Sequence, residues 1–83
     1  MQNPHPMTPE QIKAQEIIDR HRKILSVYYH PIVAQQAAVY CAISEVEGRI
    51  ETLVEFNKII PISIKAAVEQ LDAVLTELKN MNQ

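Results

Sequence analysis

The stretch VYCAISEVEGRIETL, residues 39–53, decides the fold of this chain. Its large apolar residues recur at steps of four, three, four and three, which is the heptad spacing of one face of an α-helix. No proline lies between Pro31 and Pro61, so we expect one long helix over residues 31–57. The repeating residues are Val39, Ile43, Val46, Ile50 and Leu53.

A helix over residues 9–29 is expected before Pro31. Thr8 precedes Pro9 and is followed three positions later by Gln11, which is a capping box with proline at the first helical position. Apolar residues then recur every three or four positions as far as the tyrosines, and Pro31 should end the helix. This stripe consists of Ile17, Ile18, His21, Ile24, Leu25 and Tyr28.

A third helix is expected over residues 63–80, with Ser63 as its N-cap. Its apolar residues again step by four and three. The chain is therefore predicted to be all-α, with three helices forming an antiparallel bundle or a long-helix hairpin. Residues 8–83 would form one domain, after a proline-rich disordered tail over residues 1–7. The apolar residues of the third helix are Ile64, Val68, Leu71, Leu75 and Leu78.

The size of the chain indicates that it needs a partner. A single core in 83 residues leaves little stability to spare. Cys41 is the only cysteine, so no internal disulfide can form, and a lone thiol fits a reducing compartment. Because the outer helices are shorter than the middle one, part of the middle helix is left uncovered. A second copy of the chain is the simplest cover, and we expect a homo-oligomer.

Composition also excludes some classes of function. No apolar run reaches the ~18 residues of a membrane span, and the N-terminus lacks the pattern of a secretory signal. We therefore expect a cytoplasmic protein without a membrane partner. The net charge of -2 argues against binding of extended nucleic acid, which needs many contacts from Lys and Arg to phosphates.

The middle helix carries two further patterns. A surface of small residues would let another helix pack closely on it. An acidic run is interpreted as a solvated face, in which Glu45 pairs with Arg49 at i, i+4. Gly48 marks either a close approach by another backbone or a tolerated surface position. The small residues are Ala34, Ala37, Ala38, Cys41 and Ala42, and the acidic ones are Glu45, Glu47, Glu51 and Glu55.

The segment DRHRKILSVYYH, residues 19–30, concentrates positive charge and aromatic rings. Guanidinium groups fork onto phosphate oxygens and rings stack on bases, so the segment predicts a site for a small anionic nucleotide. The alternative is a solvated helix surface, with Asp19 and Glu16 as local ion-pair partners and the tyrosines covering a small core. The candidate ligand-binding residues are Arg20, Arg22, Lys23, Tyr28, Tyr29 and His30.

Nothing in the sequence indicates catalysis. His21 lies on the apolar stripe and is interpreted as a core histidine, and Cys41 as a small buried hydrophobe. There is no glycine-rich phosphate loop and no spacing typical of metal ligands. We therefore expect no catalytic residues, no metal, no cofactor and no enzymatic activity.

Two segments resemble known proteins. TPEQIKAQEIID at residues 8–19, followed by Cys41-Ala42-Ile43 and Val46-Glu47, resembles small uncharacterised proteins of Bacteroidota phages and prophages. His21-Arg22-Lys23-Ile24, with a tyrosine shortly after and then a long helix, a loop and a final helix, is similar to the phage anti-CBASS proteins. Those proteins sequester cyclic nucleotides as oligomers, so this resemblance implies a phage-encoded anti-defence protein.

Two functions are thus expected as alternatives. The first is a non-enzymatic helical protein that sequesters a small anionic nucleotide signal between its subunits. The second is a protein-interaction module or inhibitor that presents the exposed part of the middle helix, with its alanine surface and acidic edge, to a host or phage protein.

Overall fold

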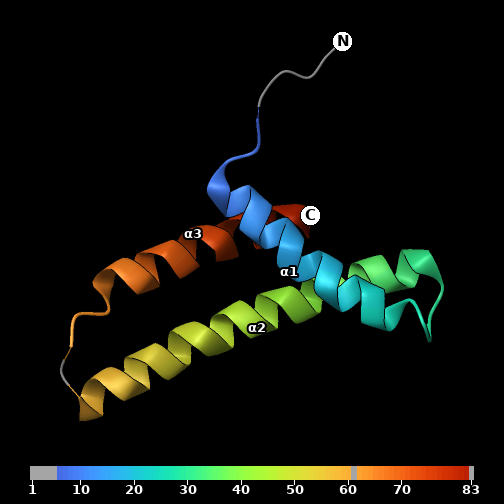
Figure 1. The fold of residues 1–83 in the computed structure, drawn as a ribbon. Coiled ribbons are helices and arrows are strands. Elements are labelled where there is room, and N and C mark those ends of the chain that lie inside the picture. Colours follow the sequence, from blue (N-terminus) through green and yellow to red (C-terminus); the bar gives the residue numbers. More distant parts are fainter. Residues whose placement is uncertain (1–5, 61, 83) are drawn as a thin grey trace.

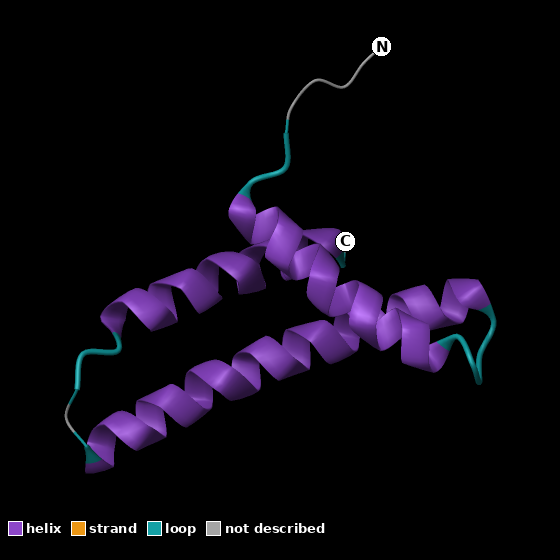
Figure 2. Ribbon diagram, in the orientation of Figure 1, coloured by secondary structure: helices purple, strands orange, loops and turns teal. Residues whose placement is uncertain are grey.

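The computed structural model describes residues 6–60 and 62–82, and over these ranges the chain forms three helices and no strand (Figures 1 and 2). They are α1 (Pro9–Leu25), α2 (Pro31–Ile59) and α3 (Lys65–Met81). The predicted all-α class is confirmed. Residues 1–5 of the expected tail and Pro61 lie outside the described residues, and residues 6–8 have no regular secondary structure.

The helices pack as a hairpin crossed by a third helix. In Figure 1, α2 and α3 run antiparallel, while α1 crosses the N-terminal half of α2 and lies beside the C-terminal end of α3. All three pairs of helices are in contact. The core therefore lies at the crossing, in one half of the molecule.

The buried residues are confined to that half. None of the described residues between 47 and 73 is fully buried, although the heptad pattern continues through them. We call residues 47–60 and 62–73 the arm, because they form a two-helix extension that α1 does not cover (Figure 1). The buried residues are Ala14, Ile17, Ile18, Ala34, Ala38, Val39, Ala42, Val46, Val74 and Leu78.

The capping box at the start of α1 is confirmed. The Gln11 N–H donates to Thr8 Oγ1 at 3.1 Å, and the Thr8 N–H donates to Gln11 Oε1 at 3.0 Å. These two bonds satisfy amides that an uncapped helix would leave to water.

The end of α1 was predicted incorrectly, because the helix stops at Leu25 rather than at residue 29. The N–H and the hydroxyl of Ser26 both donate to the Arg22 carbonyl, and the Val27 N–H bonds three residues back to Ile24. This tighter turn ends the helix. The side chains of Ile24 and Tyr28 are 59% and 75% exposed, so the buried stripe does not continue to the tyrosines.

The boundaries of the other two helices differ by a few residues from those predicted. The side chain of His30 caps α2, with Pro31 at the first position, and α2 extends to Ile59. Ser63 is not the N-cap of α3. The Val68 N–H donates to the Ile64 carbonyl, so Ile64 takes the cap position without a side-chain bond.

Three of the five small residues of α2 are internal, which corrects the expectation that a partner protein could use this surface, and Ala37 and Cys41 are half-buried. Ala34, Ala38 and Ala42 are completely buried, and the last two share one cluster with Ile17 and Ile18 of α1. Their small size lets α1 pack closely on α2. Gly48 is a tolerated surface position, because a Cβ built there meets nothing within 4 Å.

Candidate functional site

The basic residues of α1 converge on Glu45 of α2. Arg20 forks onto this carboxylate, with Nη2 at 2.9 Å from Oε2 and Nη1 at 3.2 Å from Oε1. His21 Nε2 lies 2.8 Å from Oε1, and Arg49 Nη2 lies 2.7 Å from Oε2. The Glu45 side chain is only 18% exposed. The i, i+4 spacing predicts the pair of Glu45 with Arg49, but its role as the acceptor that joins α1 to α2 depends on how the two helices cross and has no signal in the sequence.

These contacts hold Glu45 in its charged form. The hydrogen bond from Arg20 lowers the pKa of Glu45 to about 2, against the opposing effect of burial, and His21 and Arg49 add to the lowering. The same hydrogen bond raises the pKa of Arg20. The positive charge of Arg20 is therefore balanced by Glu45 within the chain. The interpretation of Glu45 as part of a solvated face is wrong, because its side chain is only 18% exposed.

Two of the other candidate residues are also engaged. Arg22 pairs with Asp19 at 2.8 Å, as the alternative interpretation expected, and donates from Nη1 to Gln35 Oε1 at 3.1 Å. His30 Nδ1 accepts the Ile32 N–H at 3.2 Å. Lys23 is exposed and has no ion pair with any described residue.

The tyrosines project into solvent instead of covering the core. Tyr28 and Tyr29 are 75% and 55% exposed, which at ~150–250 Å² per aromatic side chain leaves roughly 200–300 Å² of ring surface in water. Four aliphatic residues around the same turn are similarly exposed. We call these six residues the apolar corner, and they lie around the α1–α2 connection (Figure 1). They are Ile24, Val27, Tyr28, Tyr29, Ile32 and Val33.

Apolar patches of ~300–600 Å² are often functional on a monomer, and the apolar corner adds four exposed aliphatic residues to the roughly 200–300 Å² of its two tyrosines. No Asp, Glu, Lys or Arg occurs from Ile24 to Ser44, while Arg22 and Lys23 directly precede this stretch. The corner is thus an uncharged surface with a basic edge. The sequence predicts either a ligand site or the cover of a small core at its tyrosines, places Ile24 on the buried stripe, and carries no signal for the exposure of the other aliphatic residues.

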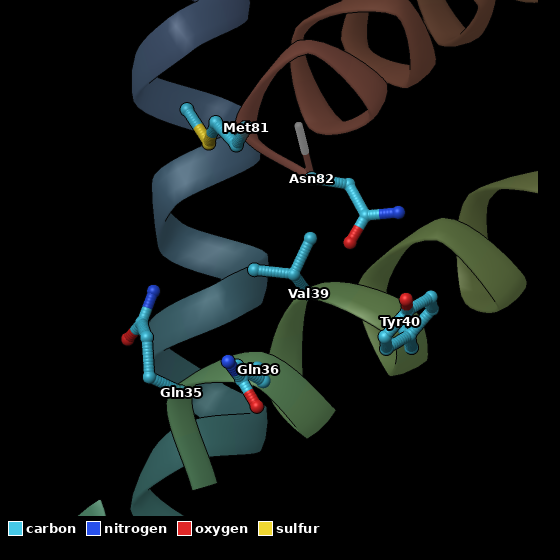
Figure 3. Close-up of a pocket in the computed structure, with 6 residues that line it drawn as sticks. All are labelled: Gln35, Gln36, Val39, Tyr40, Met81 and Asn82. Atoms are coloured by element: carbon cyan, nitrogen blue, oxygen red, sulfur yellow. The ribbon is translucent and has the colours of Figure 1, made fainter. Parts of the chain in front are cut away.

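A pocket of about 340 Å³ lies between the N-terminal half of α2 and the end of α3 (Figure 3). Three side-chain amides line it together with Val39, Met81 and the Tyr40 ring. Gln35 connects this pocket to the basic cluster, because it accepts the hydrogen bond from Arg22. The lining residues are Gln35, Gln36, Val39, Tyr40, Met81 and Asn82.

Cys41 is half-buried and free, and the parts of the chain that the structure describes hold no group of three potential metal ligands. No helix within the described residues is long and apolar enough to cross a membrane. Comparison with protein-family models, curated proteins and solved structures found no match to the chain.

Proposed function

We propose that this chain is a non-enzymatic, cytoplasmic protein-interaction module whose binding surface is the apolar corner. The observation that carries the proposal is the exposure of six large apolar side chains around one turn. Water-exposed apolar surface of this extent gains free energy when a partner covers it. The partner would provide the apolar surroundings that Tyr28 and Tyr29 do not find within the chain.

The basic edge defines the chemistry of this partner. Lys23, which has no ion pair with any described residue, occupies the last turn of α1 directly before the corner, whereas Arg22 beside it is already paired with Asp19. A helix with an apolar stripe and acidic flanks complements both the corner and Lys23, because its apolar residues pack on the corner and its carboxylates face this cation. A second copy of the chain complements the corner poorly, since it would bring Lys23 close to its own counterpart.

A pair of designed peptides tests the proposal. Both form amphipathic helices with a leucine stripe, and one carries Glu flanks while the other carries Lys flanks. We expect the Glu-flanked peptide to bind more tightly, and Ile32→Asp to weaken its binding at least about tenfold, as for loss of a contact worth over 1 kcal/mol. Val54→Asp, which alters an exposed apolar residue outside the corner, is the matched control. Equal binding of both peptides, or no effect of Ile32→Asp, would contradict the proposal.

A second candidate function is sequestration of a small anionic nucleotide, as a phage-encoded anti-defence protein. The observations that favour it are the exposed faces of Tyr28 and Tyr29 beside Lys23, together with the amide-lined pocket that Gln35 joins to Arg22. Amides can pair with base edges and tyrosine can stack on them. It ranks second because Arg20 and Arg22 already pair with carboxylates of the same chain.

Calorimetry against cyclic di- and trinucleotides and ADP-ribose isomers tests this candidate. If it is right, at least one of these ligands binds tightly, and Arg22→Ala combined with Lys23→Ala weakens that binding. Arg49→Ala removes a cation on the far side of Glu45 and serves as the control for loss of charge. Absence of binding across the whole panel would eliminate the candidate.

A further inference from the structure

The arm lacks the third helical layer that the rest of the molecule has. Where α1 crosses the hairpin, α2 and α3 contribute seven fully buried residues, but the described part of the arm contributes none. Leu53 and Leu71 are only half-buried, although they continue the heptad pattern of the core. The arm lies beyond the N-terminal end of α1, which crosses the other half of the hairpin (Figure 1).

The face of α2 that packs under α1 continues into the arm. Counting in steps of seven, which return to nearly the same side of a helix, Val46 leads to Leu53, and Phe56 lies beside Leu53. Phe56 is 42% exposed. We call this continuation the arm face.

The corresponding face of α3 continues in the same way. Steps of seven lead from Val74 to Ala67, and from Leu78 to Leu71. Val74 and Leu78 are buried in the core, whereas Ala67 is exposed and Leu71 half-buried. Both helices of the hairpin therefore extend the surface on which α1 packs, but without α1.

Charge is almost absent from the arm face. Its one charged residue is Arg49, whose guanidinium is bound to Glu45. Helical spacing places the other charges of the arm on the opposite side, where Glu47 also pairs with Lys79. These other charges are Glu47, Glu51, Glu55, Lys58, Lys65, Glu69 and Asp72.

We propose that the arm face is a self-association surface, occupied by the arm of a second copy. A face without free charge can meet itself across a two-fold axis without like-charge repulsion, unlike the apolar corner with its basic edge. The second arm would also supply the missing helical layer, since two helical hairpins packed face to face make a four-helix bundle.

The size of the face indicates a reversible dimer. The residues that define the arm face are fewer than the ~20–30 per side of a standard interface. The dimer should therefore dissociate on dilution. Its formation does not depend on the binding function of the apolar corner, which lies at the opposite end of α2 (Figure 1).

Sedimentation velocity of the full chain over a range of concentrations tests the proposal. We expect a mass that rises from one chain to two, and loss of this rise in Phe56→Asp. Val54→Asp is the matched control, because Val54 is 41% exposed on the same helix but lies off the arm face. Circular dichroism of each variant verifies that its helices are intact, and Ala67→Asp replaces Phe56→Asp if that variant loses helicity, because Ala67 is an exposed residue of the arm face on α3.

Three results would overturn the proposal. The first is a wild-type chain that stays monomeric at every concentration. The second is a Phe56→Asp or Ala67→Asp variant that is folded and still dimerises. The third is loss of the dimer in Ile32→Asp, which would place the interface at the apolar corner. Peptide binding to the corner is measured separately, so failure of one proposal leaves the other standing.

Discussion

Replacement of Glu45 by glutamine tests the contact between α1 and α2 most directly. The substitution keeps the shape of the side chain but removes the charge that Arg20, His21 and Arg49 share. Glu45 itself is only 18% exposed, and loss of this shared acceptor leaves its three partners poorly compensated. We therefore expect Glu45→Gln to destabilise the fold.

The magnitude follows from the pKa of Glu45, which falls from 4.5 to about 2 on folding, chiefly through the hydrogen bond from Arg20. At 1.36 kcal/mol per pKa unit, this lowering corresponds to about 3 kcal/mol of stability. Arg20 and Arg49 are about half exposed, so water screens part of the interaction. We expect a loss of about 1–3 kcal/mol in the free energy of unfolding at pH 7.

The pH dependence has a defined sign. Because the pKa of Glu45 is lower in the folded chain, its stabilising effect is complete above about pH 4.5 and is lost as the pH falls towards 2. The difference between wild type and Glu45→Gln should therefore be constant near neutral pH and nearly vanish at pH 2.

Urea unfolding followed by circular dichroism, from pH 7 to pH 2 at one protein concentration, measures this difference. A fixed concentration is needed because self-association alters apparent stability. Glu47→Gln is the control, since Glu47 is 52% exposed and lies 3.7 Å from Lys79, so its loss should cost no more than about 0.5 kcal/mol. The reasoning is refuted if both variants match wild type at pH 7, or if the effect of Glu45→Gln persists unchanged at pH 2.

Three further substitutions have defined outcomes in the same unfolding assay. Gly48→Ala should stabilise the chain by ~1 kcal/mol, because this exposed helical glycine has open space for a Cβ; a loss of stability would show an unrecognised contact. Thr8→Ala should cost about 1 kcal/mol through loss of the cap on α1, whereas no change would mean that this helix end contributes nothing. Ala38→Glu should lower the free energy of unfolding by more than about 4 kcal/mol, because Ala38 is completely buried under α1. A variant that stays folded and loses only partner binding would instead support an exposed alanine surface.

The order and approximate extent of the helices could be predicted from residues close together in the chain. Capping by Thr8 and Gln11 acts over three residues, and proline blocks helix at its own position and the one before it. The heptad pattern also identified the apolar side of α2 correctly. The end of α1 was harder to predict from the sequence. The turn at Ser26 and a continued helix differ by only a few local hydrogen bonds, so their free energies are similar.

The candidate site was less predictable, because it depends on which surfaces meet. Helical spacing by itself made Glu45 a surface residue and Tyr28 a continuation of the core. The crossing of α1 over α2 brings Arg20 onto Glu45 from 25 positions away and buries Ala38, while it leaves the tyrosines and the arm uncovered.

The sequence by itself determined the three helices and their apolar faces, since these follow from interactions within about one helical turn. Only the tertiary structure decided which parts of those faces are covered, because α1 spans 17 residues and α2 spans 29. Where α1 covers α2, Arg20 and Arg22 pair with carboxylates and the alanines of α2 are buried. Beyond its two ends, the apolar corner and the arm face stay open to other molecules.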